Sequence, residues 1–161
     1  MTDIKAYLDY FQILALQHVD IKSYYMMDIN EPLAALRGEM QFPALIMNTV
    51  SGNFTASNLD NVLDEIKGGF LIVSRLTNTD DFPCEMLLLE DMKRIGADII
   101  SRMNHDLMKC EPRAQKAILG FRLGSVSYQM VDAIFDNCFG FLFSFKMFSK
   151  INLDYNPLKW R

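Results

Sequence analysis

The chain has few of the residues and motifs on which protein chemistry most often depends. Its 161 residues include two histidines and three cysteines. No C-x-x-C pair, H-E-x-x-H, G-x-S-x-G or glycine-rich loop ending in Lys-Ser/Thr occurs, which excludes the usual zinc, serine-hydrolase and P-loop signatures. We therefore predict that the protein is not an enzyme and that it has no catalytic, cofactor-binding or metal-binding residues.

The ionisable residues that are present leave one alternative open. Carboxylates cluster at 60–65, 80–81 and 90–91, and such clusters can act as an acid–base pair or bind a hard metal ion. Solvation and helix capping produce the same clusters, and we favour that interpretation. His18 is predicted to pack on an N-terminal helix, and His105 to be exposed near the end of the main helix.

Long apolar runs and an export signal are also missing. No run approaches the roughly 20 apolar residues that a membrane-spanning helix needs. The first five residues lack a basic region followed by an apolar core. The three cysteines are odd in number and widely spaced, which favours free thiols. These features predict a cytoplasmic protein without membrane contact.

Positive charge is scarce over most of the chain. The net charge is −4, which disfavours a general nucleic-acid binder. Residues 1–110 hold 16 acidic and 9 basic side chains, whereas residues 111–161 hold 4 acidic and 7 basic. This asymmetry can make one face complementary to another copy of the chain. Simple solvation of both sets is the alternative.

Phenylalanine, in contrast, is abundant and regularly spaced in the last third. Phe139, Phe141, Phe143 and Phe145 alternate with other residues and are followed by Met147. Successive side chains of a strand point to opposite faces, so these five residues would form one apolar stripe. The pattern predicts a strand with one face buried under the main helix.

Two helices are predicted from three- and four-residue apolar spacing. The first covers residues 4–18, with Thr2 or Asp3 as its cap. The main helix runs from about residue 82 to 109 and ends before Pro112. Gly96 lies beside its apolar stripe, where it would let a strand approach closely.

The remaining segments predict mostly strands. Residues 22–29 are extended, residues 32–37 form one or two helical turns, and residues 42–50 form a strand that Pro43 places at a sheet edge. Residues 51–53 are predicted to turn, residues 58–67 to form a weak helix or a loop, and Gly68-Gly69 to break the chain before a central strand at 70–76.

A long hairpin is predicted over residues 118–148. Its apolar residues change parity beside Gly124, which indicates a β-bulge or a sharp bend. Its length suggests that it projects beyond the core.

These elements predict an α+β fold. A single mixed, mainly antiparallel β-sheet is covered by the N-terminal helix and the long central helix. Residues 1–161 form one domain, in which residues 152–161 are an extended C-terminal tail.

The second face of the phenylalanine strand is the candidate for a subunit contact. It is less polar than a solvated strand should be. The candidate interface residues, on this strand and on the preceding one, are Leu142, Lys146, Phe148, Arg122 and Tyr128.

The order of these elements resembles a known family. The apolar run 69–73, the helix 90–103 and the glycine-punctuated hairpin ending in 139–145 carry the likeness. The chain resembles phage tail terminator or tail-completion proteins, including those of contractile injection particles. The resemblance implies a small subunit that forms rings, often hexameric, on a tail tube or sheath, without a catalytic site or a cofactor.

From this resemblance we expect a structural, self-associating subunit whose further partners are tail tube or sheath proteins. Two alternatives stay open. One is a small-molecule-binding domain or an enzyme with a pocket between the sheet and the central helix. The other is an adaptor that regulates another protein through the hairpin.

Overall fold

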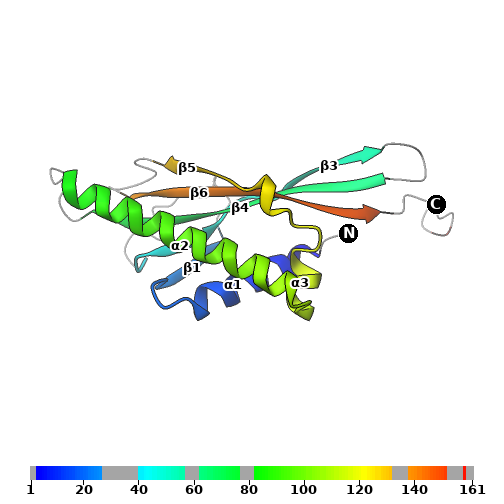
Figure 1. Cartoon of the computed structure of the whole chain (residues 1–161), viewed down its shortest axis with the longest axis horizontal. Helices are drawn as coiled ribbons and strands as arrows, with labels where there is room; N and C mark the ends of the chain where they lie inside the picture. The colour runs from blue at the N-terminus through cyan, green and yellow to red at the C-terminus, as the bar shows by residue number, and fades with distance from the viewer. Residues whose placement is uncertain are drawn as a thin grey trace.

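The protein is an α+β fold in which helices cover one face of a single mixed sheet, as the sequence predicts (Figure 1). The computed structural model describes residues 3–26, 40–56, 62–76, 82–131, 138–151 and 158. The elements are α1 (Ile4–Gln17), β1 (Ser23–Met26), β2 (Ala44–Met47), β3 (Ser51–Ala56), β4 (Val62–Arg75), α2 (Phe82–Met108), α3 (Pro112–Ala117), the 3-10 turn η2 (Leu123–Ser125), β5 (Ser127–Val131) and β6 (Cys138–Ile151). The predicted turns at 32–37, and the predicted tail at 152–161 except Leu158, lie outside these residues.

The sheet is built around β4. Its order is β1-β2-β4-β6-β5, with β3 also paired to β4. The pair of β1 and β2 is parallel, and the other pairs are antiparallel. Because β6 pairs with β4 along its whole length, these two strands form the axis of the sheet, and the remaining strands lie on either side.

The phenylalanine stripe lies under the helices over most of its length, as predicted, and only its first residue, the half-buried Phe139, is outside the core cluster. Phe143, Phe145 and Met147 are buried in one cluster with apolar residues of all three helices. Phe143 stacks on Phe70 of β4 with their ring centroids 5.2 Å apart, and Phe145 stacks on Phe11 of α1. These rings anchor the helices to the sheet, since each buried aromatic side chain removes a large apolar area from water.

Gly96 of α2 lies directly over this stripe. An alanine methyl group at this position would stand 2.0 Å from a ring carbon of Phe143, far inside van der Waals contact. The prediction that Gly96 permits close approach is therefore confirmed.

Three predictions about residues 51–69 are wrong. Residues 51–53 begin strand β3, and the described part of 58–67, from Val62 onward, belongs to strand β4, as do Gly68 and Gly69. The irregularity lies elsewhere: residues 48–50 stand opposite only residues 68–69, which makes a β-bulge between β2 and β3. The polar composition misled the prediction because β3 is exposed along its whole length and buries no apolar face.

Tyr7 of α1 explains why glycines can lie inside β4. The buried Tyr7 hydroxyl accepts a hydrogen bond from the backbone N–H of Gly69 at 3.2 Å. A methyl group on Gly68 would lie 2.6 Å from the same hydroxyl oxygen. The two residues thus leave space for a contact between α1 and the bulge.

Replacing Tyr7 with phenylalanine should lower the free energy of unfolding by about 1.5 kcal/mol, because the buried Gly69 N–H would lose its acceptor. Urea unfolding monitored by circular dichroism measures this loss. Tyr128→Phe is the matched control, since Tyr128 is half-exposed, and its effect should stay within about 0.5 kcal/mol. Equal stability of the two variants would contradict the role given to Tyr7.

Two further strand predictions need correction. Strand β2 pairs with both β1 and β4 and is not at the edge. Pro43 precedes the first residue of β2, so the N–H that proline lacks does not interrupt the hydrogen bonds between the strands. The long hairpin is also shorter than predicted, because its first strand, β5, begins only at Ser127. Residues 118–126 form no named strand, and η2 supplies the predicted bend before β5. Around Phe121 only an isolated bridge to Met147 forms.

Candidate subunit interface

The sheet face opposite the helices carries most of the predicted interface residues. Leu142, Lys146 and Phe148 alternate along β6 on this face, called the open face below, where Leu142 is paired with Leu71 of β4. At the end of β6 near Cys138 the same face is buried in a small apolar cluster with residues of β2 and β4. Lys146 Nζ lies 2.7 Å from Glu65 Oε1, and this ion pair lowers the pKa of Glu65. The Arg122 guanidinium lies 4.5 Å from the ring centroid of Phe148. Arg122, Lys146 and Phe148 therefore lie together, and Leu142 lies further along the same face.

Tyr128 lies on the other face. Its ring contacts the rings of Phe141 and Phe143, and Lys93 of α2 lies over it at 4.7 Å from the centroid. The register places Tyr128 opposite Phe143, which faces the core. Tyr128 is still about half exposed, because β5 is the last strand of the sheet.

Strands β3 and β5 are the most exposed strands of the sheet, and neither carries a charge. The third outer strand, β1, is also uncharged but is mostly half-buried. All six residues of β3 are exposed, and so are four of the five residues of β5. Phe54 on β3 is 61% exposed and Met130 on β5 is 56% exposed. Among the described residues, β3 pairs only with β4 and β5 only with β6. Each strand therefore presents one row of backbone groups to its surroundings.

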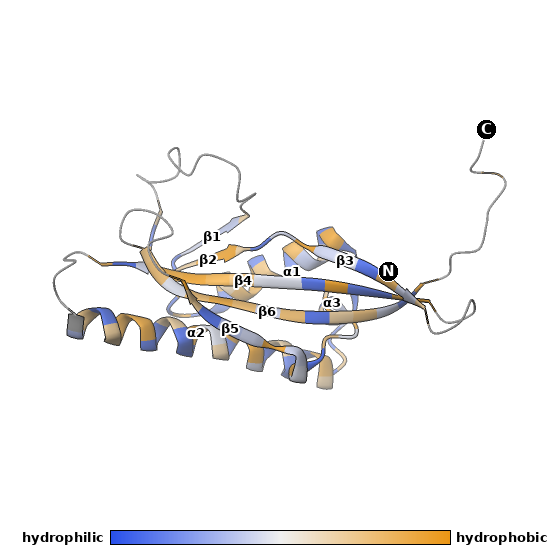
Figure 2. Cartoon of the chain, turned by 90° about the horizontal axis from the view of Figure 1, so that it is seen from above, coloured by the Kyte–Doolittle hydropathy of each residue, from blue (hydrophilic) through white to orange (hydrophobic). Residues whose placement is uncertain are grey.

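These two edges lie on opposite sides of the sheet and at opposite ends of its axis. β3 is paired with residues 62–67 of β4, and β5 with residues 140–144 of β6. The ends of β3, β4 and β6 project past the helices in Figure 1. Figure 2 shows the colour of β4 and β6 changing from mainly hydrophobic to mixed toward this projecting end. The part of the sheet that projects is thus formed by β3, β4 and the end of β6, whereas the sequence predicted that the hairpin of residues 118–148 projects.

A hollow of about 210 Å³ lies on the open face beside the bulge. It is lined mainly by hydroxyl groups and by Lys67 and Lys146, which stand directly opposite each other in the sheet. The Ser125 hydroxyl is occupied, since it donates to the carbonyl of Arg122 and accepts from the N–H of Lys146. The hollow is thus a polar part of the same open face.

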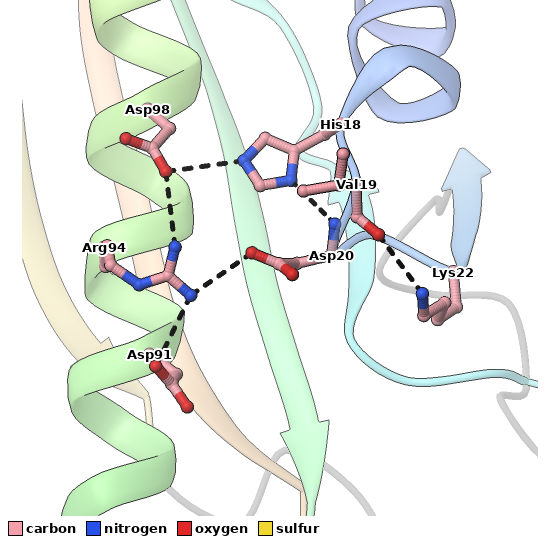
Figure 3. A network of polar contacts seen from close by, with 7 residues as sticks. All are labelled: His18, Val19, Asp20, Lys22, Asp91, Arg94 and Asp98. Carbon is pink, nitrogen blue, oxygen red and sulfur yellow. Dashed lines mark hydrogen bonds and ion pairs between the residues drawn. The ribbon is translucent and has the colours of Figure 1, made fainter.

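A polar network ties the end of α1 to α2 (Figure 3). His18 Nε2 lies 3.5 Å from Asp98, and Arg94 lies 3.2 Å from Asp20. Arg94 also contacts Asp91 and Asp98. The carboxylates and Arg94 are substantially exposed, so each of these pairs contributes little to stability. His18 is largely buried against this network, as predicted, and His105 is mostly exposed.

Asp106 is the buried carboxylate of α2. It accepts a hydrogen bond from the Tyr10 hydroxyl at 2.9 Å and one from Arg102 at 2.6 Å, and it lies 3.4 Å from His105. The Asp106 carboxylate thus has hydrogen-bond donors from both α1 and α2, and it connects these two helices.

Replacing Asp106 with alanine should lower the free energy of unfolding by about 1.5 kcal/mol, because the buried Tyr10 hydroxyl would lose its acceptor. Asp91→Ala, an exposed change on the same helix, should cost less than about 0.5 kcal/mol. Chemical denaturation of Asp106→Ala, Tyr10→Phe and the double variant tests the pairing. Strictly additive effects in the double variant would contradict it.

Stability should also fall at alkaline pH. Burial raises the pKa of Tyr24 to about 12 and that of Tyr7 still further, whereas an unfolded tyrosine has a pKa of about 10. Burial and the Asp106 carboxylate likewise raise the pKa of Tyr10. Below about pH 10 both states keep these protons, so the contribution is constant. Between about pH 10 and 12 the unfolded chain loses protons that the native chain retains, and the free energy of unfolding falls as pH rises.

Urea midpoints measured across this alkaline window test the prediction. The midpoint should drop continuously, and Tyr24→Phe should reduce the size of the drop, because one raised pKa is removed. A midpoint that stays constant up to about pH 12 would contradict the burial of these hydroxyls.

Other kinds of site find no support in the described part of the chain. Within it, no group of three or more His, Cys, Asp or Glu residues is placed to hold a metal ion. Its helices are also too short or too polar to cross a membrane. No protein-family model, curated protein or solved structure matches the sequence or the fold.

Sequence reasoning missed the edge strand β3. Its residues, Ser51 to Ala56, resemble a turn in composition, and Phe54 is their only large apolar side chain. The absence of any charge between Glu39 and Asp60 is the signal that could have indicated a protected or paired segment.

Proposed function

We propose that the protein is a structural, self-associating subunit of a phage-like tail or contractile injection particle. The observation that carries this proposal is the pair of exposed, uncharged edges, β3 and β5, on opposite sides of one sheet. A subunit with two such edges can contact a neighbour on each side, which is what a ring requires.

Exposed strand edges are unusual in a protein that works alone. Natural sheets protect their edges with lysine, proline, bulges or a covering segment, because free N–H and C=O groups bind other strands. Strands β3 and β5 contain neither charge nor proline, and their residues are exposed. This combination favours an edge that another chain covers in the assembled state.

The proposed role in a tail rests on the resemblance to tail terminator proteins as well as on these edges. The order of helix, apolar strand, long helix and phenylalanine strand supports a tail terminator or tail-completion role. Tail tube or sheath proteins are the partners that this role requires. We propose no catalytic step, since the space between sheet and α2 is filled by Phe70, Phe143 and the α2 stripe.

Mass measurement tests the proposal directly. The protein should run as a closed multimer in native mass spectrometry and light scattering, alone or after mixing with purified tail tube or sheath protein. A strict monomer at high concentration that also fails to bind either partner would falsify the proposal.

A further inference from the structure

We infer that strand β3 of one copy pairs with strand β5 of the next copy, so that the sheet continues from subunit to subunit. The inference rests on the proposed self-association and adds the contact through which it occurs. The occupant of each edge is thus a second copy of this chain.

The positions of the edges allow every copy to use both at once. β3 extends the sheet on the side of β2, and β5 extends it on the far side of β6. One kind of contact therefore covers β3 and β5 of every subunit, and the third outer strand, β1, takes no part in it. Repetition of such a head-to-tail contact gives a ring when the rotation between copies closes.

The two strands also carry similar types of side chain on corresponding faces of the sheet. On the helix-bearing face, β3 presents Phe54, and β5 presents Tyr128 and Met130. On the open face, both strands present small uncharged polar residues. These are Ser51, Asn53 and Thr55 on β3, and Ser127 and Gln129 on β5, where the apolar Val131 ends the same row.

The match extends to length and packing. The strands have six and five residues, so their ladders can pair almost completely. When the helices of both copies lie on the same side, Phe54 meets the ring of Tyr128 or the side chain of Met130. Aromatic and apolar cross-strand pairs of this kind stabilise a sheet, and here they would also cover side chains that are exposed in the single chain.

On the helix-bearing face, charge favours this pairing over the pairing of like edges. Asp64 stands opposite Phe54 beside β3, and Lys93 lies over Tyr128 beside β5. Head-to-tail pairing brings these two opposite charges toward each other, whereas the pairing of like edges would bring two like charges together. The open face beside β3 carries Lys67, so this complementarity is confined to the helix-bearing face.

Two edge-blocked variants distinguish these arrangements. Asn53→Lys with Thr55→Lys blocks β3, and Ser127→Lys with Gln129→Lys blocks β5, because lysine on an edge strand opposes strand addition. All four residues are exposed. Gln12→Lys with Gln17→Lys, at exposed positions of α1, is the control with the same change in charge. Thermal melting confirms that each variant is folded.

The expected result is specific to head-to-tail pairing. In native mass spectrometry the control assembles like the unchanged protein, and each blocked variant alone is a monomer. An equimolar mixture of the two blocked variants forms a heterodimer and nothing larger, since it contains one free β3 and one free β5 per pair.

Other outcomes overturn the inference in distinguishable ways. Dimers of each blocked variant alone, without a mixed species, would show pairing of like edges. Assembly of both blocked variants to the size of the unchanged protein would place the contact elsewhere, while self-association itself would stand. An unchanged protein that stays monomeric both alone and with tail tube or sheath protein would overturn the inference and the proposed assembly together.

Crosslinking gives a second measurement that does not depend on charge. Asn53→Cys and Gln129→Cys are introduced into separate copies that also carry Cys84→Ser and Cys110→Ser, which removes the exposed native thiols. A short bismaleimide should join the two kinds of copy in the mixture and leave each kind unjoined alone. Crosslinked dimers of either kind alone would overturn the inference.

Discussion

Replacing Gly120 with alanine is expected to lower the free energy of unfolding by about 3 kcal/mol, a large share of the stability of a domain this size. Gly120 has a φ of +77°, a left-handed conformation that costs about 1–2 kcal/mol for residues with a Cβ. An alanine methyl group would also stand 1.8 Å from the Phe148 carbonyl oxygen. That oxygen belongs to the backbone of β6 and cannot move aside without disturbing the sheet.

The effect should extend to assembly. The Gly120 carbonyl accepts a hydrogen bond from the Phe148 N–H, and the Arg122 N–H donates to the Lys146 carbonyl. These bonds fix the segment that leads through η2 into β5. Native mass spectrometry of Gly120→Ala should therefore show loss of the proposed multimer together with the drop in thermal midpoint.

Gly124→Ala is the matched control. It lies four residues away, in η2, and a methyl group added there would meet no atom within 4 Å beyond its immediate chain neighbours. This substitution should be neutral or stabilise the protein by up to about 1 kcal/mol, because alanine reduces the freedom of the unfolded chain. Equal losses in the two variants would show that the turn does not depend on the conformation of Gly120.

Replacing Gly96 with alanine should cost about 2 kcal/mol or more, although the same change normally strengthens a helix by about 1 kcal/mol. The new methyl group would overlap the Phe143 ring. That ring cannot retreat, since it is buried and stacked on Phe70 at an interplanar angle of 11°. The cost of overpacking a filled core then exceeds the gain in helix propensity. Urea unfolding measures whether the free energy of unfolding falls or rises.

Two further variants test whether the loss comes from overlap with the Phe143 ring. Ser101→Ala, at an exposed position of α2, should be slightly stabilising, which isolates helix propensity from packing. Phe143→Leu removes the ring that the methyl group meets, so adding it to Gly96→Ala should restore part of the lost stability. A Gly96→Ala protein as stable as the Ser101→Ala protein would contradict the close approach of α2 and β6.

The sequence predicts the helices and the central strands of this fold because their burial is regular. The stripe of α2 and the alternating phenylalanines of β6 each leave a periodic signal. The contact between Gly96 and Phe143 could also be anticipated, since a glycine beside an apolar stripe has few other roles. These features are set by local spacing, which a single sequence displays.

The failures have a common physical cause. Strand β3 is exposed on both faces, so burial imposes no alternation on it, and its Ser, Gly and Asn residues look like a turn. Gly68 and Gly69 look like a break, but they accommodate the hydroxyl of Tyr7 from a distant helix. Such positions are determined by partners far away in the chain, which composition and spacing do not display.

The faces on which the candidate interface residues lie could be predicted only in part, because alternation along a strand is a local pattern. Leu142, Lys146 and Phe148 share the open face because alternation along β6 places them there. Tyr128 lies on β5, beyond the bend at η2, and the register of β5 places it on the face that α2 covers. The edge strand β3 was missed because a strand exposed on both faces leaves no periodic signal in the sequence.

The pairing of β4 with β6 also determines when this protein can fold. β4 occupies residues 62–75, but its full-length partner is β6 at residues 138–151. During synthesis the ribosome releases the apolar β4 well before β6 exists, and the phenylalanine stripe that completes the core arrives last. The nascent chain must therefore keep an unpaired hydrophobic strand from aggregating while α2 and α3 are made, which gives chaperones a defined interval in which to act.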